Sequence, residues 1–379
     1  MNQPRSARIT GWGAYAPANV LTNDDLSRIV DTSDEWIVSR TGIRERRVAG
    51  PGESTATMAA AAGARAIAVA GLDPDDIDLV LVATLTPDHL TPATSVLVKE
   101  ALGAKRAAAF DLGAACSGFV YGYATAHAYV MSGLARHALV IGSELLTRFL
   151  DWTDRNTCVL FGDGAGAVVI SASDEPGGGM SGLELTADPD GAWSIWIPAG
   201  GARRPSTGRT IAGAEQYLRM DGRATYRYAT RTIASTALTA IERAGWTPDD
   251  VDLFVPHQAN QRIIESVAAG LGIPMERIYL DLDRYGNTSA ASVSIALTEA
   301  VDSGRVQVGD RILFVAFGAG FTSGAAAVTW TADPADGRRA ANAPSVTPIH
   351  QPGDWDSGDP VPEPIAGILA GKQHTEVPA

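Results

Sequence analysis

The pattern of apolar and polar residues describes a helix, a loop and a strand, and this pattern occurs twice in the chain. Residues 71–79 (GLDPDDIDL) recur as residues 245–253 (GWTPDDVDL), and each copy lies between a helical periodicity and a short apolar run. The elements expected around the two copies are helices at 55–70 and 230–244 and strands at 79–83 and 253–255. An internal repeat of this kind indicates two related halves.

Each half continues with a second helix and a second strand. These are expected as helices at 116–132 and 289–303 and as strands at 138–142 and 311–315. Helices and strands that alternate at this length favour crossover units, largely parallel sheets and helices packed on them. We therefore predict an α/β protein of two similar halves, residues 1–175 and 176–332, packed as a pseudo-symmetric pair. Their junction is the expected place for a site, because ligands often bind between domains.

The alternating pattern ends after Trp330. Residues 333–379 are rich in Pro, Asp, Gly and Ala and contain few large apolar residues outside 365–369. This composition predicts a mostly disordered tail. His350 and His374 fall in that tail and are therefore poor catalytic candidates.

Composition limits the class of protein and its compartment. With 379 residues, 45% of them hydrophobic and 19% charged, the chain can bury a large core. Its two cysteines, Cys116 and Cys158, make a disulfide framework implausible and fit a reducing cytoplasm. The N-terminus lacks the apolar run of a signal peptide, and the apolar stretch at 58–72 is interrupted by Arg65. That stretch is shorter than the roughly 20 residues that span a bilayer, so we expect a soluble cytoplasmic protein.

The charge distribution restricts the choice of partner. A formal net charge of -13 argues against nucleic acid, which would require a basic surface. Arg223, Arg227 and Arg231 recur every four residues and share one face if their segment is helical. With Arg262 they would form a local patch for an acidic partner. A solvated helix face with no partner fits the same charge pattern equally well.

Cys116 is a candidate nucleophile because of where it stands. It lies in residues 111–118 (DLGAACSG), between a short strand and an apolar helix. The peptide dipoles at a helix N-terminus favour a thiolate, and the small neighbours leave room for a substrate. On residue type alone, a buried cysteine is more often a small apolar core residue.

Three further segments contain candidate site residues. His257, in residues 255–260 (VPHQAN), follows the second repeat's strand, at the strand end where α/β sites gather, although a structural hydrogen bond is its common alternative. Asn287, in residues 285–292 (YGNTSAAS), opens a helix and is either functional or a cap. The glycine turn at 317–324 is either a tight turn or a source of backbone N–H groups for a substrate oxygen.

A second glycine-rich run does not support a nucleotide site. Residues 161–167 (FGDGAGA) lead from one strand into another and lack the helix whose N-terminus would hold a phosphate. We therefore do not expect nucleotide-dependent redox chemistry.

The motifs around Cys116, His257 and Asn287, in this order, resemble those of the 3-oxoacyl-acyl-carrier-protein synthase III family. The resemblance extends from residue 8 to about residue 331 and includes residues 32–46 (TSDEWIVSRTGIRER), which match the family's coenzyme A region. It implies a thiolase-like fold, in which two duplicated α/β halves have mixed sheets that sandwich buried helices, and a homodimer.

The resemblance also implies a reaction. Cys116 would take the acyl group from an acyl-coenzyme A, while the backbone N–H groups of Cys116 and Ala319 hold the oxyanion. Malonyl-acyl carrier protein would then bind, and His257 and Asn287 would donate hydrogen bonds to its thioester oxygen as carbon dioxide leaves. The carbanion would attack the acyl cysteine and give 3-oxoacyl-carrier protein, which initiates fatty acid synthesis. This scheme requires a neutral His257 with its proton on the donating nitrogen. It requires no cofactor and no metal, because the coenzyme A thioester is a substrate.

Contact residues follow from the same resemblance. They are Trp36, Arg40 and Arg155 for coenzyme A, Arg227, Gln258 and Arg262 for the carrier protein, and Thr91 and Phe161 for the acyl pocket. Trp36 and Arg155 would stack on the adenine and Arg40 would meet a phosphate, which suits a planar guanidinium. The small side chain of Thr91 would leave room for longer or branched acyl groups.

Alternative activities differ at single positions. A degradative thiolase would need a second cysteine in the glycine turn, where Ala319 stands, and a Cys-His-His synthase would have histidine in place of Asn287. Acyltransferases that use an alcohol or amine acceptor keep the Cys and His, and Asn287 counts against them. A non-catalytic carrier-binding subunit would form no adduct at Cys116. The acyl primer stays open, as does the choice between membrane lipid and a secondary metabolite.

Overall fold

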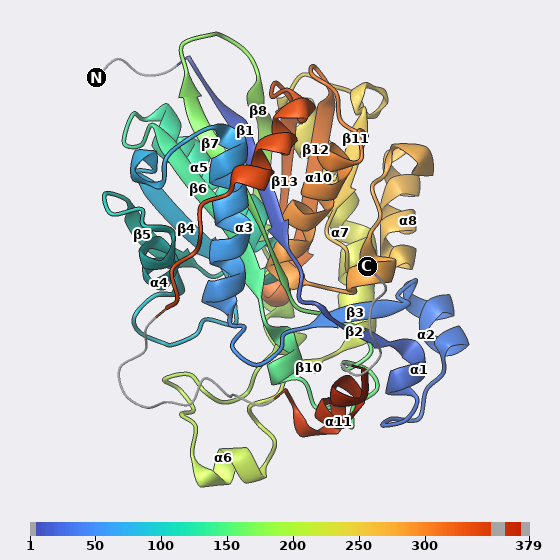
Figure 1. The fold of residues 1–379 in the computed structure, drawn as a ribbon. Coiled ribbons are helices and arrows are strands. Elements are labelled where there is room, and N and C mark those ends of the chain that lie inside the picture. Colours follow the sequence, from blue (N-terminus) through green and yellow to red (C-terminus); the bar gives the residue numbers. More distant parts are fainter. Residues whose placement is uncertain (1–4, 350–360, 373–379) are drawn as a thin grey trace.

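The computed structural model describes residues 5–349 and 361–372, and two β-sheets form its centre (Figure 1). The five-stranded sheet has the order β1-β7-β6-β4-β5 and the four-stranded sheet the order β11-β12-β13-β8. The strands of the first sheet, in that order, are Ser6–Tyr15, Gly164–Ser173, His137–Glu144, Leu79–Ala83 and Ala108–Leu112. Those of the second are Leu253–Pro256, Arg311–Gly318, Thr322–Thr329 and Gly179–Ala187. The expected boundary between residues 175 and 176 lies between the last strand of one sheet and the first strand of the other.

Both sheets are mixed. Strand β4 pairs in parallel with β5 and β6, and β11 pairs in parallel with β12, whereas β1, β7, β13 and β8 pair antiparallel. The expectation of largely parallel sheets, drawn from the alternating pattern, is therefore corrected. Strand β13 follows β12 after the three residues Ala319–Phe321, a connection too short for a parallel crossover.

Helices form the outer layers and a buried central layer. Helices α5 (Gly118–Met131) and α10 (Ser292–Asp302) lie between the sheets, where a common core includes residues of α5, β4, β6, α10 and β12. Their apolar surface on nearly all sides suits this position. The outer face of the first sheet is covered by α3 (Thr55–Ala70) and α4 (Thr94–Leu102), and that of the second by α7 (Gly222–Arg243) and α8 (Gln261–Leu271).

The two central helices begin in the same way. A three-residue 3-10 turn precedes each of them, Ala115–Ser117 before α5 and Ser289–Ala291 before α10. The first residue of each turn has a left-handed backbone, with φ of 47° at Ala115 and 50° at Ser289. Such a conformation is costly for a residue other than glycine, and it is maintained only by its surroundings. The duplicated halves thus contain the same strained turn twice.

Smaller elements gather at the lower end of the molecule in Figure 1. They are β2 (Asn19–Thr22), α1 (Asn23–Leu26), α2 (Asp34–Thr41), β3 (Glu45–Val48), α6 (Gly208–Ala212) and β10 (Arg219–Met220). Two further short elements are β9 (Ile195–Trp196) and α9 (Leu282–Tyr285). Strands β2 and β3 pair with each other, as do β9 and β10. A separate apolar cluster, which includes Leu21, Ile37 and Trp152, holds much of this region together.

The segment 333–379 differs from the expected disordered tail in its described parts. Pro334–Asn342 forms 3-10 helix that lies against α3, where Arg339 donates a hydrogen bond to the carbonyl of Val69 (3.3 Å). Helix α11 (Glu363–Lys372) buries Ile365 and Leu369 in the Leu21 cluster, because the few apolar residues of the segment fall on one helix. Residues 350–360 and 373–379, with His350 and His374, lie outside the described residues.

Within residues 5–349 and 361–372, no helix has the length and apolar character needed to cross a membrane.

Candidate active site

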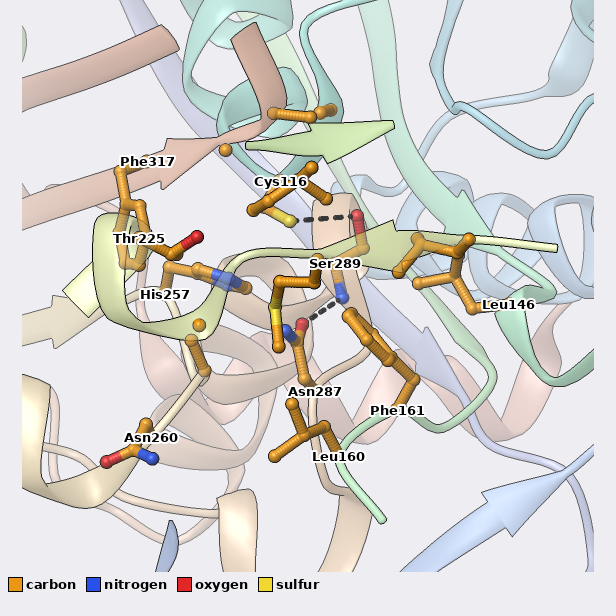
Figure 2. Close-up of a pocket in the computed structure, with 18 of the residues that line it drawn as sticks. Cys116, Leu146, Leu160, Phe161, Thr225, His257, Asn260, Asn287, Ser289 and Phe317 are labelled. Atoms are coloured by element: carbon orange, nitrogen blue, oxygen red, sulfur yellow. Dashed lines mark hydrogen bonds between the residues drawn. The ribbon is translucent and has the colours of Figure 1, made fainter. Parts of the chain in front are cut away.

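A cavity at the junction of the halves contains Cys116, His257 and Asn287 in its wall (Figure 2). Cys116 lies in the turn between β5 and α5, His257 directly follows β11, and Asn287 precedes the turn into α10. The three motifs are far apart in sequence, and the packing of the two halves brings them together. Apolar residues form much of the remaining wall, namely Leu85, Leu146, Leu160, Phe161, Ile195, Leu218, Met220, Ile263 and Phe317.

The Cys116 thiol is buried and neutral in this structure. Burial raises its pKa to about 12, and the charge of Glu144 adds to the increase, while the contact with the Ser289 hydroxyl opposes it. The hydroxyl Oγ of Ser289 lies 3.2 Å from Sγ. The expectation that a helix terminus favours the thiolate is therefore not met in the resting site, because the cost of burial outweighs the favourable interactions. Attack by this sulfur requires that its proton be removed.

His257 is also buried and neutral. Burial lowers its pKa to about 3. Its Nδ1 lies 2.6 Å from Oγ of Ser292, and its backbone N–H donates to the carbonyl of Val315 (2.7 Å). The Ser292 hydroxyl also accepts a long hydrogen bond from the backbone N–H of Gln258 (3.4 Å). When this hydroxyl donates to Nδ1, the imidazole proton is on Nε2, the tautomer in which Nε2 is a donor.

The side-chain amide of Asn287 is held through its oxygen. Its Oδ1 accepts a hydrogen bond from the backbone N–H of Ser289 (2.8 Å), as Figure 2 shows. Its backbone is fixed on both sides, since its N–H donates to the carbonyl of Leu160 (2.8 Å) and its carbonyl accepts from Gly162 (3.1 Å). The cap-like contact therefore engages the amide oxygen and leaves the NH₂ group as the donor.

The glycine turn after β12 lies against the cysteine turn. Ala319 lines the cavity together with Cys116. At Gly318 the two backbones approach so closely that an added Cβ would lie 2.5 Å from the backbone nitrogen of Cys116. The backbone nitrogens of Cys116 and Ala319 thus belong to adjacent turns at one end of the cavity, an arrangement that suits an oxyanion site.

A buried carboxylate contacts the cavity residue Ser289, and it was not among the residues predicted from the sequence. Glu144 ends β6 and accepts hydrogen bonds from Oγ1 of Thr86 (2.7 Å), the backbone N–H of Leu85 (3.2 Å) and Oγ of Ser289 (3.2 Å). Burial raises its pKa to about 7. The only signal in the sequence was a charged residue at the end of an apolar strand. Ser289 and Ser292 stand inside the YGNTSAAS motif, where nothing distinguished them from helix-start residues.

Two of the predicted contact residues do not have the expected environment. Gln258 was expected to contact a carrier protein, but it is buried and its side chain is fully engaged. Its Nε2 donates to the carbonyls of Pro256 (2.9 Å) and Tyr279 (3.1 Å), and its Oε1 accepts from the backbone N–H of Asp281 (3.2 Å). Thr91 was expected in the acyl pocket, but it is exposed and does not line the cavity of this chain, whereas Phe161 does.

The residues expected to contact coenzyme A form one cluster. The guanidinium carbon of Arg40 lies 4.9 Å from the ring centroid of Trp36, and that of Arg155 lies 5.2 Å from it. Arg155 also donates to the backbone carbonyl of Asp31 (2.9 Å). Both arginines are exposed, and such cation–π contacts have modest strength at a surface.

The arginines expected to contact a carrier protein are also exposed. Arg223, Arg227 and Arg231 lie on α7, and Arg262 lies in the first turn of the neighbouring α8. Their guanidinium groups are thus available at the surface.

Comparisons with known proteins agree with this geometry. Residues 110–189 match a family model described as "3-Oxoacyl-[acyl-carrier-protein (ACP)] synthase III", and residues 241–330 match the model of its C-terminal region. A protein of Roseiflexus sp. (strain RS-1) named beta-ketoacyl-[acyl-carrier-protein] synthase III is 55% identical over 326 residues, which are 86% of this chain and 99% of the relative. The protein of the same name from Rhizobium meliloti is 48% identical over 326 residues, 85% of this chain and 98% of the relative.

Solved structures give the same result for the fold. The 3-oxoacyl-[acyl-carrier-protein] synthase III of Aquifex aeolicus has a TM-score of 0.79 and 44% identity, with 86% of this chain and 100% of that chain covered. The priming beta-ketosynthase of the R1128 polyketide biosynthetic pathway has a TM-score of 0.82 and 39% identity, with 88% and 98% covered.

Proposed function

The chain belongs to the 3-oxoacyl-[acyl-carrier-protein] synthase III family, whose thiolase-like fold it has, and on this premise we propose that Cys116, His257 and Asn287 are its catalytic residues. The enzyme is an acyltransferase of the condensing type, and its reaction initiates fatty acid synthesis. We further propose that its substrates are an acyl-coenzyme A and malonyl-acyl carrier protein.

The first half of the reaction places the acyl group on Cys116. The sulfur attacks the thioester carbon, and the backbone N–H groups of Cys116 and Ala319 stabilise the oxyanion. The close approach of the two turns at Gly318 supports this assignment. Coenzyme A then leaves, and the apolar wall that includes Leu146 and Phe161 receives the acyl chain.

The second half of the reaction depends on two neutral donors. As malonyl loses carbon dioxide, negative charge develops on its thioester oxygen, and His257 Nε2–H and the Asn287 NH₂ group stabilise it. The observation that carries this proposal is the pair of contacts that fixes the opposite ends of these side chains, Ser292 at His257 and the Ser289 N–H at Asn287. A protonated imidazole is not required, which agrees with the lowered pKa of His257.

Surface residues would bind coenzyme A and the acyl carrier protein. The Trp36 ring and the Arg155 guanidinium against it are suited to stacking on an adenine, and Arg40 beside the same ring is suited to a phosphate. Arg227 and Arg262 are exposed on adjacent helices and would meet an acidic carrier protein. Gln258 has no part in this contact.

We also propose a cytoplasmic homodimer. Strand β5 is at the edge of the five-stranded sheet, and Leu90, in the loop between β4 and α4, is 86% exposed. An unpaired edge and an exposed apolar side chain favour isologous pairing with a second copy. Both cysteines are free, which fits a reducing compartment. The mass of the particle by light scattering tests the dimer.

The decisive experiment detects the acyl enzyme. Purified protein is incubated with a panel of acyl-coenzyme A thioesters of different length and branching, and adducts are located by mass spectrometry. An acyl group on Cys116 is expected, together with a 3-oxoacyl product and carbon dioxide after malonyl-acyl carrier protein is added. Cys116→Ala should form neither product. Cys158→Ala is the matched control, because Cys158 is also buried but does not line the cavity.

Two results would contradict the proposal. The absence of an adduct with every primer would exclude the acyl-enzyme mechanism. An adduct that passes its acyl group on without release of carbon dioxide would indicate an acyltransferase that does not condense.

A further inference from the structure

The hydrogen bonds of Ser289 connect the nucleophile to a buried carboxylate. Its Oγ lies 3.2 Å from Sγ of Cys116 and 3.2 Å from Oε1 of Glu144. A hydroxyl has one proton to donate and two lone pairs that accept. The same group can therefore accept the thiol proton while it donates its own proton to the carboxylate. Figure 2 shows this hydroxyl directed at the sulfur.

The backbone at Ser289 is strained in a way that positions this hydroxyl. Its φ of 50° places it among the left-handed residues, and it occupies the first position of the turn that leads into α10. The corresponding residue of the other half is Ala115, with φ of 47°. The same conformation is thus adopted by alanine in one half, whereas in the other half its side chain contacts both Cys116 and Glu144.

The surroundings of Glu144 suit a proton acceptor. It is fully buried, and the groups that contact its carboxylate are neutral, namely the hydroxyls of Thr84, Thr86 and Ser289 and the backbone N–H of Leu85. Among the described residues, Cys116, beyond Ser289, is the titratable group whose pKa the charge of Glu144 affects, and His257, which lines the same cavity as that thiol, is neutral. With a pKa of about 7, the carboxylate is available in its ionised form near neutral pH.

We propose that Glu144 accepts the proton of Cys116 through the hydroxyl of Ser289 when the enzyme is acylated. This inference rests on the proposed function, since it assigns the base for the acyl-transfer half of that reaction. Glu144 acts through another side chain and does not touch the substrate.

The proton and electron pairs balance over the acylation step. As the Cys116 sulfur forms its bond to the thioester carbon, its proton passes to Ser289 Oγ, and the Ser289 proton passes to Glu144. The tetrahedral intermediate then breaks its bond to the coenzyme A sulfur. Ser289 lines the cavity, so the proton held by Glu144 returns through this hydroxyl to the departing thiolate. Acyl-Cys116, coenzyme A thiol and ionised Glu144 remain.

The test measures how the reactivity of Cys116 depends on pH. Alkylation by iodoacetamide and single-turnover acylation by acyl-coenzyme A are followed by mass spectrometry between pH 5.5 and 9.5 in the wild type, Glu144→Gln and Ser289→Ala. The wild-type rates should increase through an apparent pKa near that of Glu144, about 7. Each variant should lose this transition and react about 10²–10⁴-fold more slowly at neutral pH, the usual range for loss of a general base. Ser289→Ala is sterically compatible, because alanine already occupies the equivalent turn.

A structural role for Glu144 predicts different results. Because Glu144 also anchors the loop after β4 through Thr86 and Leu85, its loss could lower the rate by disturbing that loop. In that case Glu144→Gln would have a reduced rate at every pH with the transition unchanged, and the proposal would be overturned. The Glu144→Gln, Ser289→Ala double variant separates the two roles further, since a shared path predicts that it is no slower than the slower single variant.

A change at Thr86 provides a readout that a structural role does not produce. The Thr86 hydrogen bond lowers the pKa of Glu144, so Thr86→Val should move the transition to higher pH with little change in the plateau rate. A transition that stays at the wild-type pH would contradict the proposal. Iodoacetamide requires only a reactive sulfur, so failure of the proposed function appears separately, as wild-type alkylation without any acyl adduct.

Discussion

A single added methyl group at Gly318 should disable acylation without unfolding the protein. The Cβ of Gly318→Ala would lie 2.5 Å from the Cys116 backbone nitrogen, 3.1 Å from Cβ of Ala115 and 3.2 Å from Cα of Cys116. These partners are backbone or turn atoms that cannot rotate away. The φ of Gly318 is -158°, an extended value that any residue adopts, so the effect is a clash and not a backbone preference.

The magnitude follows from the displacement that relieves the clash. Ordinary van der Waals contact begins at roughly 3.5 Å, so the cysteine turn must move by about 1 Å relative to the glycine turn. Overpacking of this kind costs about 1–3 kcal/mol of unfolding free energy. A misplacement of about 1 Å in a reacting group can cost about 10²-fold in rate. We therefore expect single-turnover acylation to fall about 100-fold while the chain remains folded.

The assay compares Gly318→Ala with a matched glycine variant. Gly113 precedes Cys116 by three residues, and a Cβ there would meet no heavy atom within 4 Å. Gly113→Ala should therefore acylate at close to the wild-type rate. Acyl adducts are timed by quenched mass spectrometry, and melting temperatures verify folding. Acylation of Gly318→Ala at the wild-type rate would refute the close approach of the two turns and the oxyanion site built on it.

Three other changes test separate parts of the structure. Asn287→Asp replaces the NH₂ donor by an acceptor, so the rate of carbon dioxide release from malonyl-acyl carrier protein should fall about 10²–10³-fold. The acyl adduct at Cys116 should still form. An equal loss of both steps would contradict the role assigned to Asn287. Burial lowers the pKa of His257 to about 3, so this imidazole binds a proton more readily in the unfolded chain than in the folded one. The folded state therefore loses stability as the pH falls through about 6.5, the pKa of histidine in an unfolded chain. Between pH 7.5 and pH 5.5, the unfolding free energy measured with urea should decrease by about 1.4 kcal/mol more in the wild type than in His257→Gln. An equal decrease in the two proteins would disprove this linkage. Removal of residues 350–379 exposes the sites of Ile365 and Leu369 and should lower the unfolding free energy by about 3 kcal/mol, and an unchanged denaturation midpoint would show that α11 does not stabilise the fold.

The sequence predicted the repeated framework well because local patterns determine it. Helix α3 and strand β4 begin and end at the expected residues, since a capping serine at Ser54 and the glycine Gly71 define the helix. Helix α7 begins at Gly222, eight residues earlier than expected, because the side chain of Asp221 accepts from two backbone N–H groups of its first turn.

The site was predictable where a motif falls at the end of a strand or the start of a helix. Cys116 and His257 follow strand ends, whereas Asn287 precedes the turn into α10, and the packing of the halves brings them into one cavity. The connection from Cys116 to Glu144 through Ser289 joins residues up to 173 positions apart, and no local pattern encodes that contact. Gln258 was wrongly predicted to contact a partner, because the sequence shows only a polar residue beside His257. In the fold its side chain is buried and forms hydrogen bonds with backbone groups.

The two left-handed turns have a consequence for how the enzyme responds to damage. Ala115 and Ser289 have costly backbone conformations in the turns that lead into α5 and α10, the helices that fill the space between the sheets. Backbone strain of this kind persists only while the surrounding structure over-determines it. A cavity made deep between the sheets, for example at Val293, should therefore relax the geometry at the nucleophile before it reduces the folded population. Loss of activity would then precede loss of structure. Core residues between the sheets that never approach a substrate would in this way influence the rate of catalysis.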